Sequence, residues 1–170
     1  VDVGRWLTTD PRVSMITFTG SPPVARAISQ VAGLRRTTFE LGGNAAVVID
    51  AGIDAPSLVD KLVIGSFAYS GQVCISVQRI YVHRSSFDDF TSKFVERSAR
   101  LKMGDPLDEQ TELGPVITDQ AAQRIDAWVN EAAQAGATVL YGNRREGRMM
   151  QATVLTGVKD DMRVMHEEVF

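Results

Sequence analysis

The sequence contains few residues that bind metals or form disulfides: Cys74 is its only cysteine, and it has two histidines. A single cysteine excludes an internal disulfide, which favours a reducing compartment, and we therefore expect a cytoplasmic protein. Because the histidines and the cysteine are scattered along the chain, the pattern argues against a zinc site, and we expect no bound metal.

A net positive charge and a long apolar run are also missing from the sequence. The formal net charge is −3, so the basic excess that would predict a nucleic-acid partner is missing. No apolar run reaches the ~18 residues of a membrane helix, and residues 1–13 lack the order of a signal peptide, so we expect no membrane partner. Hydrophobic residues make up 44% of the 170, which is enough for a globular core. The chain starts on valine and stops on HEEVF, and we expect a piece of a larger protein.

Strand and helix patterns alternate along the chain. Expected strands cover 14–20, 35–41, 44–50, 78–84, 137–142 and 152–158, and expected helices cover 22–33, 55–71, 85–101 and 118–136. The run NAAVVID is continuously apolar, as in a buried parallel strand. Two helices carry apolar stripes that should face a core: Leu58, Leu62, Val63 and Phe67 in one, and Phe87, Phe90, Phe94 and Leu101 in the other. The alternation predicts an α/β fold with a largely parallel sheet flanked by helices.

The segment FTGS, residues 18–21, leads from the first expected strand into a helix. Gly20 would let a ligand approach the backbone closely, and the helix start offers free N–H groups and the positive end of the helix dipole, which suits a phosphate. The segment lacks the spaced glycines of a dinucleotide fingerprint. On spacing alone, an ordinary turn capped by Ser21 is the simpler interpretation.

The segment FELGGN, residues 39–44, places Glu40 between a strand pattern and two glycines. A carboxylate there could act as a general base, with the glycines leaving space for a ligand. A solvated glutamate before a flexible turn is the simpler interpretation of this segment in isolation.

The segment SGQVCIS, residues 70–76, contains Cys74. The thiolate is the nucleophilic form of cysteine, and it needs a base or fixed dipoles to attack well. The neighbouring residues carry no charge and no histidine lies within eight residues, so His83 or His166 would have to be recruited through the fold. Free cysteines are often packed as small apolar side chains, and chemistry alone favours that structural role here.

The order of these segments is more specific than any one of them. FTGS, FELGGN, SGQVC with the following QRIYV, GDPLDEQTELGPVIT and the terminal HEEVF resemble the landmarks of the aldehyde dehydrogenase superfamily, in the order found in that family. The resemblance covers nearly the whole chain. It implies an enzyme that oxidises a small-molecule aldehyde to a carboxylic acid with NAD or NADP, and a homodimer or homotetramer as the complete protein.

The resemblance also implies roles for single residues. Cys74 matches the nucleophile that forms a thiohemiacetal and then a thioester, and Glu40 matches the base that activates the hydrolytic water. Gly20 and Ser21 match the contact with the cofactor pyrophosphate, and Val24 matches the apolar residue that flanks the adenine.

Further cofactor contacts are implied around the nicotinamide. Leu41 and Gly42 fall at positions near the nicotinamide in the family. Glu168 matches the glutamate that holds the nicotinamide ribose, and Phe170 matches an aromatic residue beside that ring.

The family pattern also divides the chain. Residues 1–40 would be the end of a Rossmann-like cofactor domain, and residues 41–170 would be an aldehyde-dehydrogenase-like catalytic domain that is incomplete at its C-terminus. The family's upstream oxyanion-site asparagine and the lysine that selects NAD or NADP lie outside these residues. Three alternatives stay open: a CoA-acylating relative, which commonly lacks the glutamate, a fragment inactive by itself, and a thiol hydrolase that uses Cys74 alone.

Overall fold

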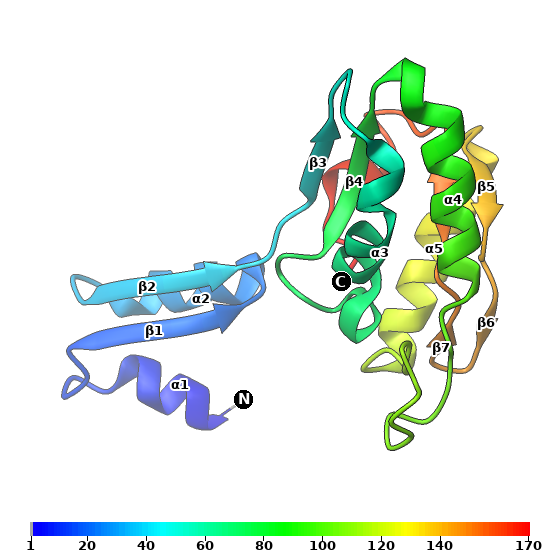
Figure 1. Ribbon diagram of the computed structural model, residues 1–170. Helices are drawn as coiled ribbons and strands as arrows, with labels where there is room; N and C mark the ends of the chain where they lie inside the picture. Colours follow the sequence, from blue (N-terminus) through cyan, green and yellow to red (C-terminus); the bar gives the residue numbers. More distant parts are fainter. Residues whose placement is uncertain (1) are drawn as a thin grey trace. The chain divides into compact units, whose positions relative to one another are not determined.

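The computed structural model describes residues 2–170 (Figure 1). They form two compact units, of which the first ends at Gly42 and the second runs Gly43–Phe170. The structural division therefore lies two residues after the domain boundary expected from the sequence. Their assignment as a cofactor domain and a catalytic domain stays a prediction.

The first unit contains α1 (Asp2–Thr9), β1 (Met15–Gly20), α2 (Pro22–Ala32) and β2 (Arg36–Leu41). The two strands pair in parallel, and the helix between them provides the crossover that parallel strands require. Buried Ile16, Ala25 and Ala32 form its small core, and the rings of Phe18 and Phe39 meet edge to face at 6.4 Å. Helix α1 was not predicted, and none of its residues is buried.

The second unit begins with β3 (Ala45–Ile49), which pairs in parallel with β4 (Val77–Val82). Between them lie a 3₁₀ turn η1 (Ala55–Leu58), α3 (Val59–Phe67) and a second 3₁₀ segment η2 (Ala68–Gly71). The turn η3 (Arg84–Ser86) then leads into α4 (Phe87–Ala99), which packs against α3 (Figure 1).

The core of this part contains the apolar stripes of α3 and α4. Leu62, Val63, Phe90 and Phe94 are buried, and the rings of Phe90 and Phe94 stack with centroids 5.5 Å apart. Phe87 differs from its prediction because it occupies the first position of α4, where its side chain remains 37% exposed.

The rest of the second unit contains α5 (Asp119–Gln134), β5 (Thr138–Tyr141), β6 (Arg145–Glu146), β7 (Met149–Met150), β8 (Val154–Thr156) and α6 (Arg163–His166). Helix α5 begins where the sequence predicted, since Thr118 Oγ1 accepts the amide N–H of Ala121 at 3.1 Å. The pairs β5–β8 and β6–β7 are antiparallel, so only the strands of the first 82 residues pair in parallel. The connection from β5 to β8 contains no helix, and a hairpin-like connection of this kind suits antiparallel strands.

The second unit contains a partly open cavity of about 560 Å³. Its walls include β4, the inner faces of α3 and α4, β8 and the end of the chain, and they are predominantly apolar. Among residues 2–170, no helix has both the length and the apolar character needed to cross a membrane. The same residues contain no cluster of three or more side chains suited to holding a metal ion.

Candidate active-site and cofactor-binding residues

The carboxyl ends of β1 and β2 bring the two sequence motifs of the first unit together. In the parallel register Thr19 lies opposite Glu40, and Gly20 lies opposite Leu41. FTGS and FELGG therefore leave the sheet at the same edge, which is where parallel α/β sheets bind ligands. Sequence spacing could not predict this pairing, because it depends on the register of the two strands.

The turn between β1 and α2 has an unusual set of hydrogen-bond donors. Ser21 is the N-cap residue of α2, but its hydroxyl makes no capping hydrogen bond. Pro22 and Pro23 follow, and neither has an N–H to offer to an anion. Because these two positions offer no N–H group, the exposed Ser21 hydroxyl is a more important donor here than the free N–H groups expected at a helix start.

The space at Gly20 is filled by the ring of Phe18. A Cβ built on Gly20 would lie 2.5 Å from Cζ of Phe18, closer than non-bonded carbon atoms approach. Val24, one turn into α2, is 48% exposed, and Leu41 at the end of β2 is also exposed. Val24 and Leu41 thus add exposed apolar surface to the unit that carries the Ser21 hydroxyl.

Glu40 is exposed at the end of β2, and the neighbouring Gly42 is partly exposed. The Glu40 carboxylate makes no hydrogen bond or ion pair with the described residues of the first unit. The geometry is that of a solvated carboxylate at a strand end, so both the base and the solvated-residue interpretations are compatible with it.

Cys74 lies at the second position of a turn that runs from Val73 to Ser76. The turn is closed by the Ser76 amide, which donates to the Val73 carbonyl at 2.9 Å. The thiol is exposed within these residues. Among these residues nothing packs over the thiol, and the role of Cys74 stays a prediction.

The polar side chains of SGQVCIS hold the turn in place. Ser76 is only 4% exposed, and its hydroxyl donates to the Ser66 carbonyl at 3.0 Å. Ser70 Oγ donates to the Gly114 carbonyl at 2.8 Å. Gln72 Oε1 accepts the amide N–H of Ile117 at 2.8 Å. Cys74 is the exposed tip of a segment whose flanks are fixed.

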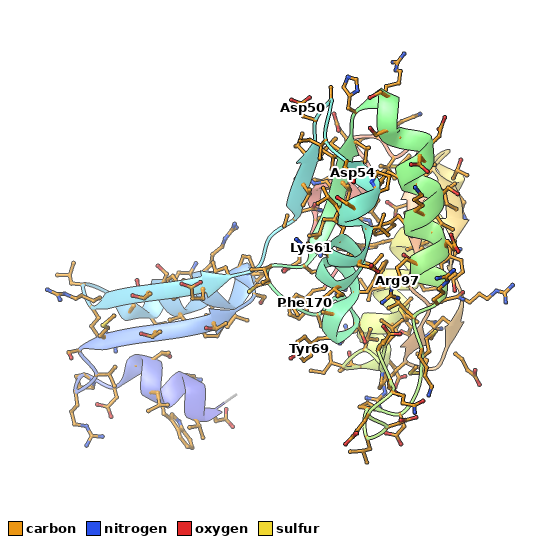
Figure 2. The ribbon with its side chains drawn as sticks, viewed as in Figure 1. Asp50, Asp54, Lys61, Tyr69, Arg97 and Phe170 are labelled. Atoms are coloured by element: carbon orange, nitrogen blue, oxygen red, sulfur yellow. The ribbon has the colours of Figure 1, made fainter. Side chains whose placement is uncertain are left out.

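The helix expected over 55–71 ends early, and the reason lies beside the cysteine turn. Tyr69, Ser70 and Gly71 all have left-handed backbone conformations, with φ of 52°, 60° and 73°. Ala68 already leaves the helical conformation with ψ of 138°, so α3 ends at Phe67, and the left-handed residues that follow cannot resume a right-handed helix. Figure 2 labels Tyr69, which projects beyond the end of α3 and is 81% exposed.

The cysteine turn also borders the cavity of the second unit. Ser70, Gly71 and Ser76 line the cavity, whereas Cys74 does not. The thiol therefore lies outside the lining of this apolar space, although its turn contributes to that lining.

The terminal segment HEEVF is anchored by residues that sequence analysis did not single out. The Gly43 amide donates to Glu168 Oε1 at 3.2 Å, and Asn44 Nδ2 donates to the Glu167 carbonyl at 2.8 Å. The Val169 amide donates to Gln78 Oε1 at 3.1 Å. These contacts position Glu168 beside the start of the second unit.

Arg124 of α5 holds the same segment from another side. Its guanidinium donates to the carbonyls of Glu168, Val169 and Phe170, at 3.3, 2.7 and 3.1 Å. It also lies over the ring of Trp128, 5.0 Å from the ring centroid. No sequence signal identified Arg124, since an arginine on an amphipathic helix is ordinarily solvent-facing.

A second arginine reinforces this region electrostatically. Arg163 of α6 packs over Trp128 and pairs with Glu131 of α5. The hydrogen bond from Arg163 lowers the pKa of the Glu131 carboxyl. The pair ties α6, which leads into HEEVF, to α5.

The predicted site residues therefore fall into two groups. The first unit contains Gly20, Ser21, Val24, Glu40, Leu41 and Gly42, and the second contains Cys74, Glu168 and Phe170. Each group is organised by its own unit, through the β1–β2 register in the first and through the contacts of the cysteine turn and of HEEVF in the second.

Comparison with known proteins agrees with the order of the motifs. Residues 1–170 match the model of the aldehyde dehydrogenase family. The chain is 43% identical over 169 residues to 3-sulfolactaldehyde dehydrogenase of Priestia aryabhattai, covering 99% of this chain and 35% of that protein. The chain thus spans about a third of the length of this curated relative.

Solved structures show the same relationship. Aldehyde dehydrogenase 21 from Physcomitrella patens, solved with the reaction product succinate, superposes with a TM-score of 0.92 and 36% identity, covering 99% of this chain and 35% of that one. The glyceraldehyde-3-phosphate dehydrogenase GapN from Methanocaldococcus jannaschii, solved with NADP, gives a TM-score of 0.94 and 36% identity, covering 98% and 36%. The chain belongs to the aldehyde dehydrogenase family.

Proposed function

We propose that the protein containing these residues oxidises an aldehyde to a carboxylic acid with NAD or NADP, using Cys74 as the nucleophile. The exposure of Cys74 supports this role most strongly, because its turn is fixed by hydrogen bonds at both flanks while the thiol stays accessible. A cysteine that served only packing would bury its sulfur.

The residues present fit a dinucleotide. Ser21 offers a hydroxyl without a capping partner, beside a glycine at the edge where β1 and β2 end. We assign Gly20, Ser21 and Val24 to the pyrophosphate and adenine, and Leu41 and Gly42 to the nicotinamide. When bound, the nicotinamide would supply the hydride acceptor.

Glu168 and Phe170 are assigned to the nicotinamide ribose. One oxygen of the Glu168 carboxylate accepts the Gly43 amide, and a carboxylate has further acceptor capacity for a ribose hydroxyl. Phe170 is 39% exposed, so its ring has a free surface within this chain.

The chemistry of the protein groups follows from these assignments. The Cys74 thiolate adds to the aldehyde carbon, forming a carbon–sulfur bond, and the carbonyl oxygen becomes an alkoxide that is stabilised as an oxyanion. The Cys74 amide has no main-chain hydrogen-bond partner among the described residues, so it is free to donate to that oxygen. Loss of hydride leaves a thioester on Cys74.

Hydrolysis of the thioester needs a base. We assign this step to Glu40, which accepts a proton from water as the water oxygen attacks the acyl carbon. The carbon–sulfur bond then breaks, releasing the carboxylic acid and the Cys74 thiolate. Cytoplasmic location and assembly as a homodimer or homotetramer remain predictions for the complete protein.

Two substitutions in the complete protein test this function. Cys74→Ser should abolish aldehyde-dependent NADH or NADPH formation, because an alkoxide is far harder to generate than a thiolate. Glu40→Gln should slow thioester hydrolysis more than hydride transfer, giving a pre-steady-state burst of reduced cofactor. Near-normal turnover of Cys74→Ser would eliminate the mechanism.

Product analysis with and without CoA separates the two fates of the thioester. The hydrolytic function predicts free carboxylic acid under both conditions. Accumulation of acyl-CoA would instead assign the protein to the CoA-acylating type. Cleavage of an activated ester without any cofactor-dependent oxidation would support the thiol hydrolase.

A further inference from the structure

The cysteine turn is preceded by a strained stretch of backbone. Tyr69 and Ser70 are not glycines, yet both adopt left-handed conformations. Each such residue costs roughly 1–2 kcal/mol relative to a right-handed conformation. Strain of this kind persists only where the surroundings determine the conformation, and it is concentrated at functional sites.

Gln72 is the residue that closes this stretch. Its amide N–H and its side-chain Nε2 both donate to the Tyr69 carbonyl, each at 3.2 Å. Its Oε1 accepts the Ile117 amide at 2.8 Å. One side chain thus bonds to the strained turn and to a loop 45 residues further along the chain.

The loop that Gln72 contacts is itself well anchored. Leu113 and Val116 are each only 2% exposed, and the Val116 amide donates to the Arg148 carbonyl at 3.0 Å. The loop therefore provides a fixed support, and Gln72 transfers its position to the chain that enters the cysteine turn. On the other side of the thiol, buried Ser76 provides the second fixed point.

We propose that Gln72 is the positioning residue for Cys74. Its side-chain amide holds the turn against the Gly114–Ile117 loop and so determines the position of the thiol. Gln72 acts through the backbone, two residues from Cys74, and has no chemical role of its own. The inference rests on the proposed function for its catalytic consequence, but the structural link can be measured without any turnover.

The first test measures the structural link by hydrogen exchange with mass spectrometry on the complete protein. Gln72→Met has nearly the same size but removes both side-chain hydrogen bonds, so exchange should accelerate in residues 69–76 and also in residues 114–117. Gln72→Glu retains an acceptor for the Ile117 amide and should keep residues 114–117 protected. Gln123→Met, an exposed change on α5, should alter neither segment.

The second test measures position by kinetics. Gln72→Met should lower the rate of hydride transfer about tenfold to a hundredfold with little change in KM, as expected when a nucleophile is displaced from its attack geometry. Gln123→Met should stay within about twofold of the unchanged protein. The rate of Cys74 alkylation by iodoacetamide, followed over pH on the peptide that contains it, separates position from charge. In Gln72→Glu the added negative charge should move the pH profile of alkylation to higher pH. Gln72→Met adds no charge, and it should lower the rate of hydride transfer at every pH.

Two outcomes would overturn the proposal. One is unchanged exchange of residues 114–117 in Gln72→Met, since Gln72 would then add nothing to the hydrogen bond by which Ser70 Oγ already holds the Gly114 carbonyl. The other is a Gln72→Met protein that transfers hydride at the normal rate. If the unchanged protein shows no dehydrogenase activity at all, the proposed function fails, while the exchange experiment still decides whether Gln72 positions the turn.

Discussion

The backbone amide of Gly43 donates a hydrogen bond to the Glu168 carboxylate, although 125 positions separate the two residues in sequence. This bond joins the first residue of the second unit to the segment HEEVF. It uses one carboxylate oxygen and fixes the orientation of the side chain. A glutamate held in this way is prepared to accept a second hydrogen bond from a ligand without first losing much conformational freedom.

Replacing Arg124 should loosen the segment that carries Glu168. Arg124→Met removes three hydrogen bonds from a charged donor to the carbonyls of residues 168–170, and we expect a loss of about 1.5–3 kcal/mol in the free energy of unfolding. Urea denaturation measures the change. Arg100→Met is the matched control, because Arg100 pairs only with Glu96 on the surface of α4 and should cost about 0–0.5 kcal/mol. Equal effects of the two substitutions would contradict the anchoring role of Arg124.

Two glycines with left-handed backbone should respond differently to alanine. Gly142 has φ of 87°, and a Cβ there would lie 2.1 Å from the Ala152 carbonyl oxygen. Gly147 has φ of 57° but no atom within 4 Å of such a Cβ. Gly147→Ala should therefore cost about 1 kcal/mol from backbone strain alone, and Gly142→Ala at least about 2 kcal/mol more. Thermal denaturation compares them, and equal costs would mean that the approach of β5 and β8 relaxes freely.

The Glu112 carboxylate should contribute stability that depends on pH. The Lys102 amide donates to one of its oxygens at 3.1 Å and Arg97 donates to the other at 3.2 Å, and together they lower its pKa below the usual 4.5. Because the pKa is lower in the folded state, this contribution is complete above the unfolded pKa and is lost as the pH falls through the folded pKa.

Glu112→Gln tests that contribution. The substitution should reduce stability by up to about 1 kcal/mol at neutral pH, since the pair is partly solvent-exposed, and the difference from the unchanged protein should vanish in acid. Urea denaturation across the acid range measures it. Glu109→Gln, on the same loop and without a hydrogen bond from the described residues, should show no such dependence. A difference that grows in acid would contradict the sign of the shift.

Periodicity predicted the positions of most strands and of the long helices, because their apolar faces are buried in the structure. Phe90 and Phe94 of α4 and Val63 of α3 lie in the core as expected. Helix α1 was missed because no residue in it is buried, so it has no apolar face directed at a core within these residues. The antiparallel pairing of β5 with β8 was missed because strand direction depends on partners rather than on local pattern.

The candidate site was predicted less evenly. The parallel register that brings Gly20 opposite Leu41 is consistent with the grouping of the two first motifs. The exposure of Cys74 could not be deduced from SGQVCIS, because it depends on hydrogen bonds to residues some 40 positions away. Gln72 was visible only as a neighbour of the cysteine, since nothing in the sequence shows that its amide meets Ile117.

The backbone of the last three residues is held by side chains from distant parts of the sequence. Arg124 donates hydrogen bonds to the three carbonyls, and Gln78 Oε1 accepts the amide N–H of Val169. A strand in a sheet is held by the backbone of its neighbours, which almost any sequence provides. Here two particular side chains replace those neighbours, so constraint on the local backbone has moved to positions 44 to 46 and 91 residues away. Natural variation should therefore avoid substitutions at those two distant positions as well as within the segment itself.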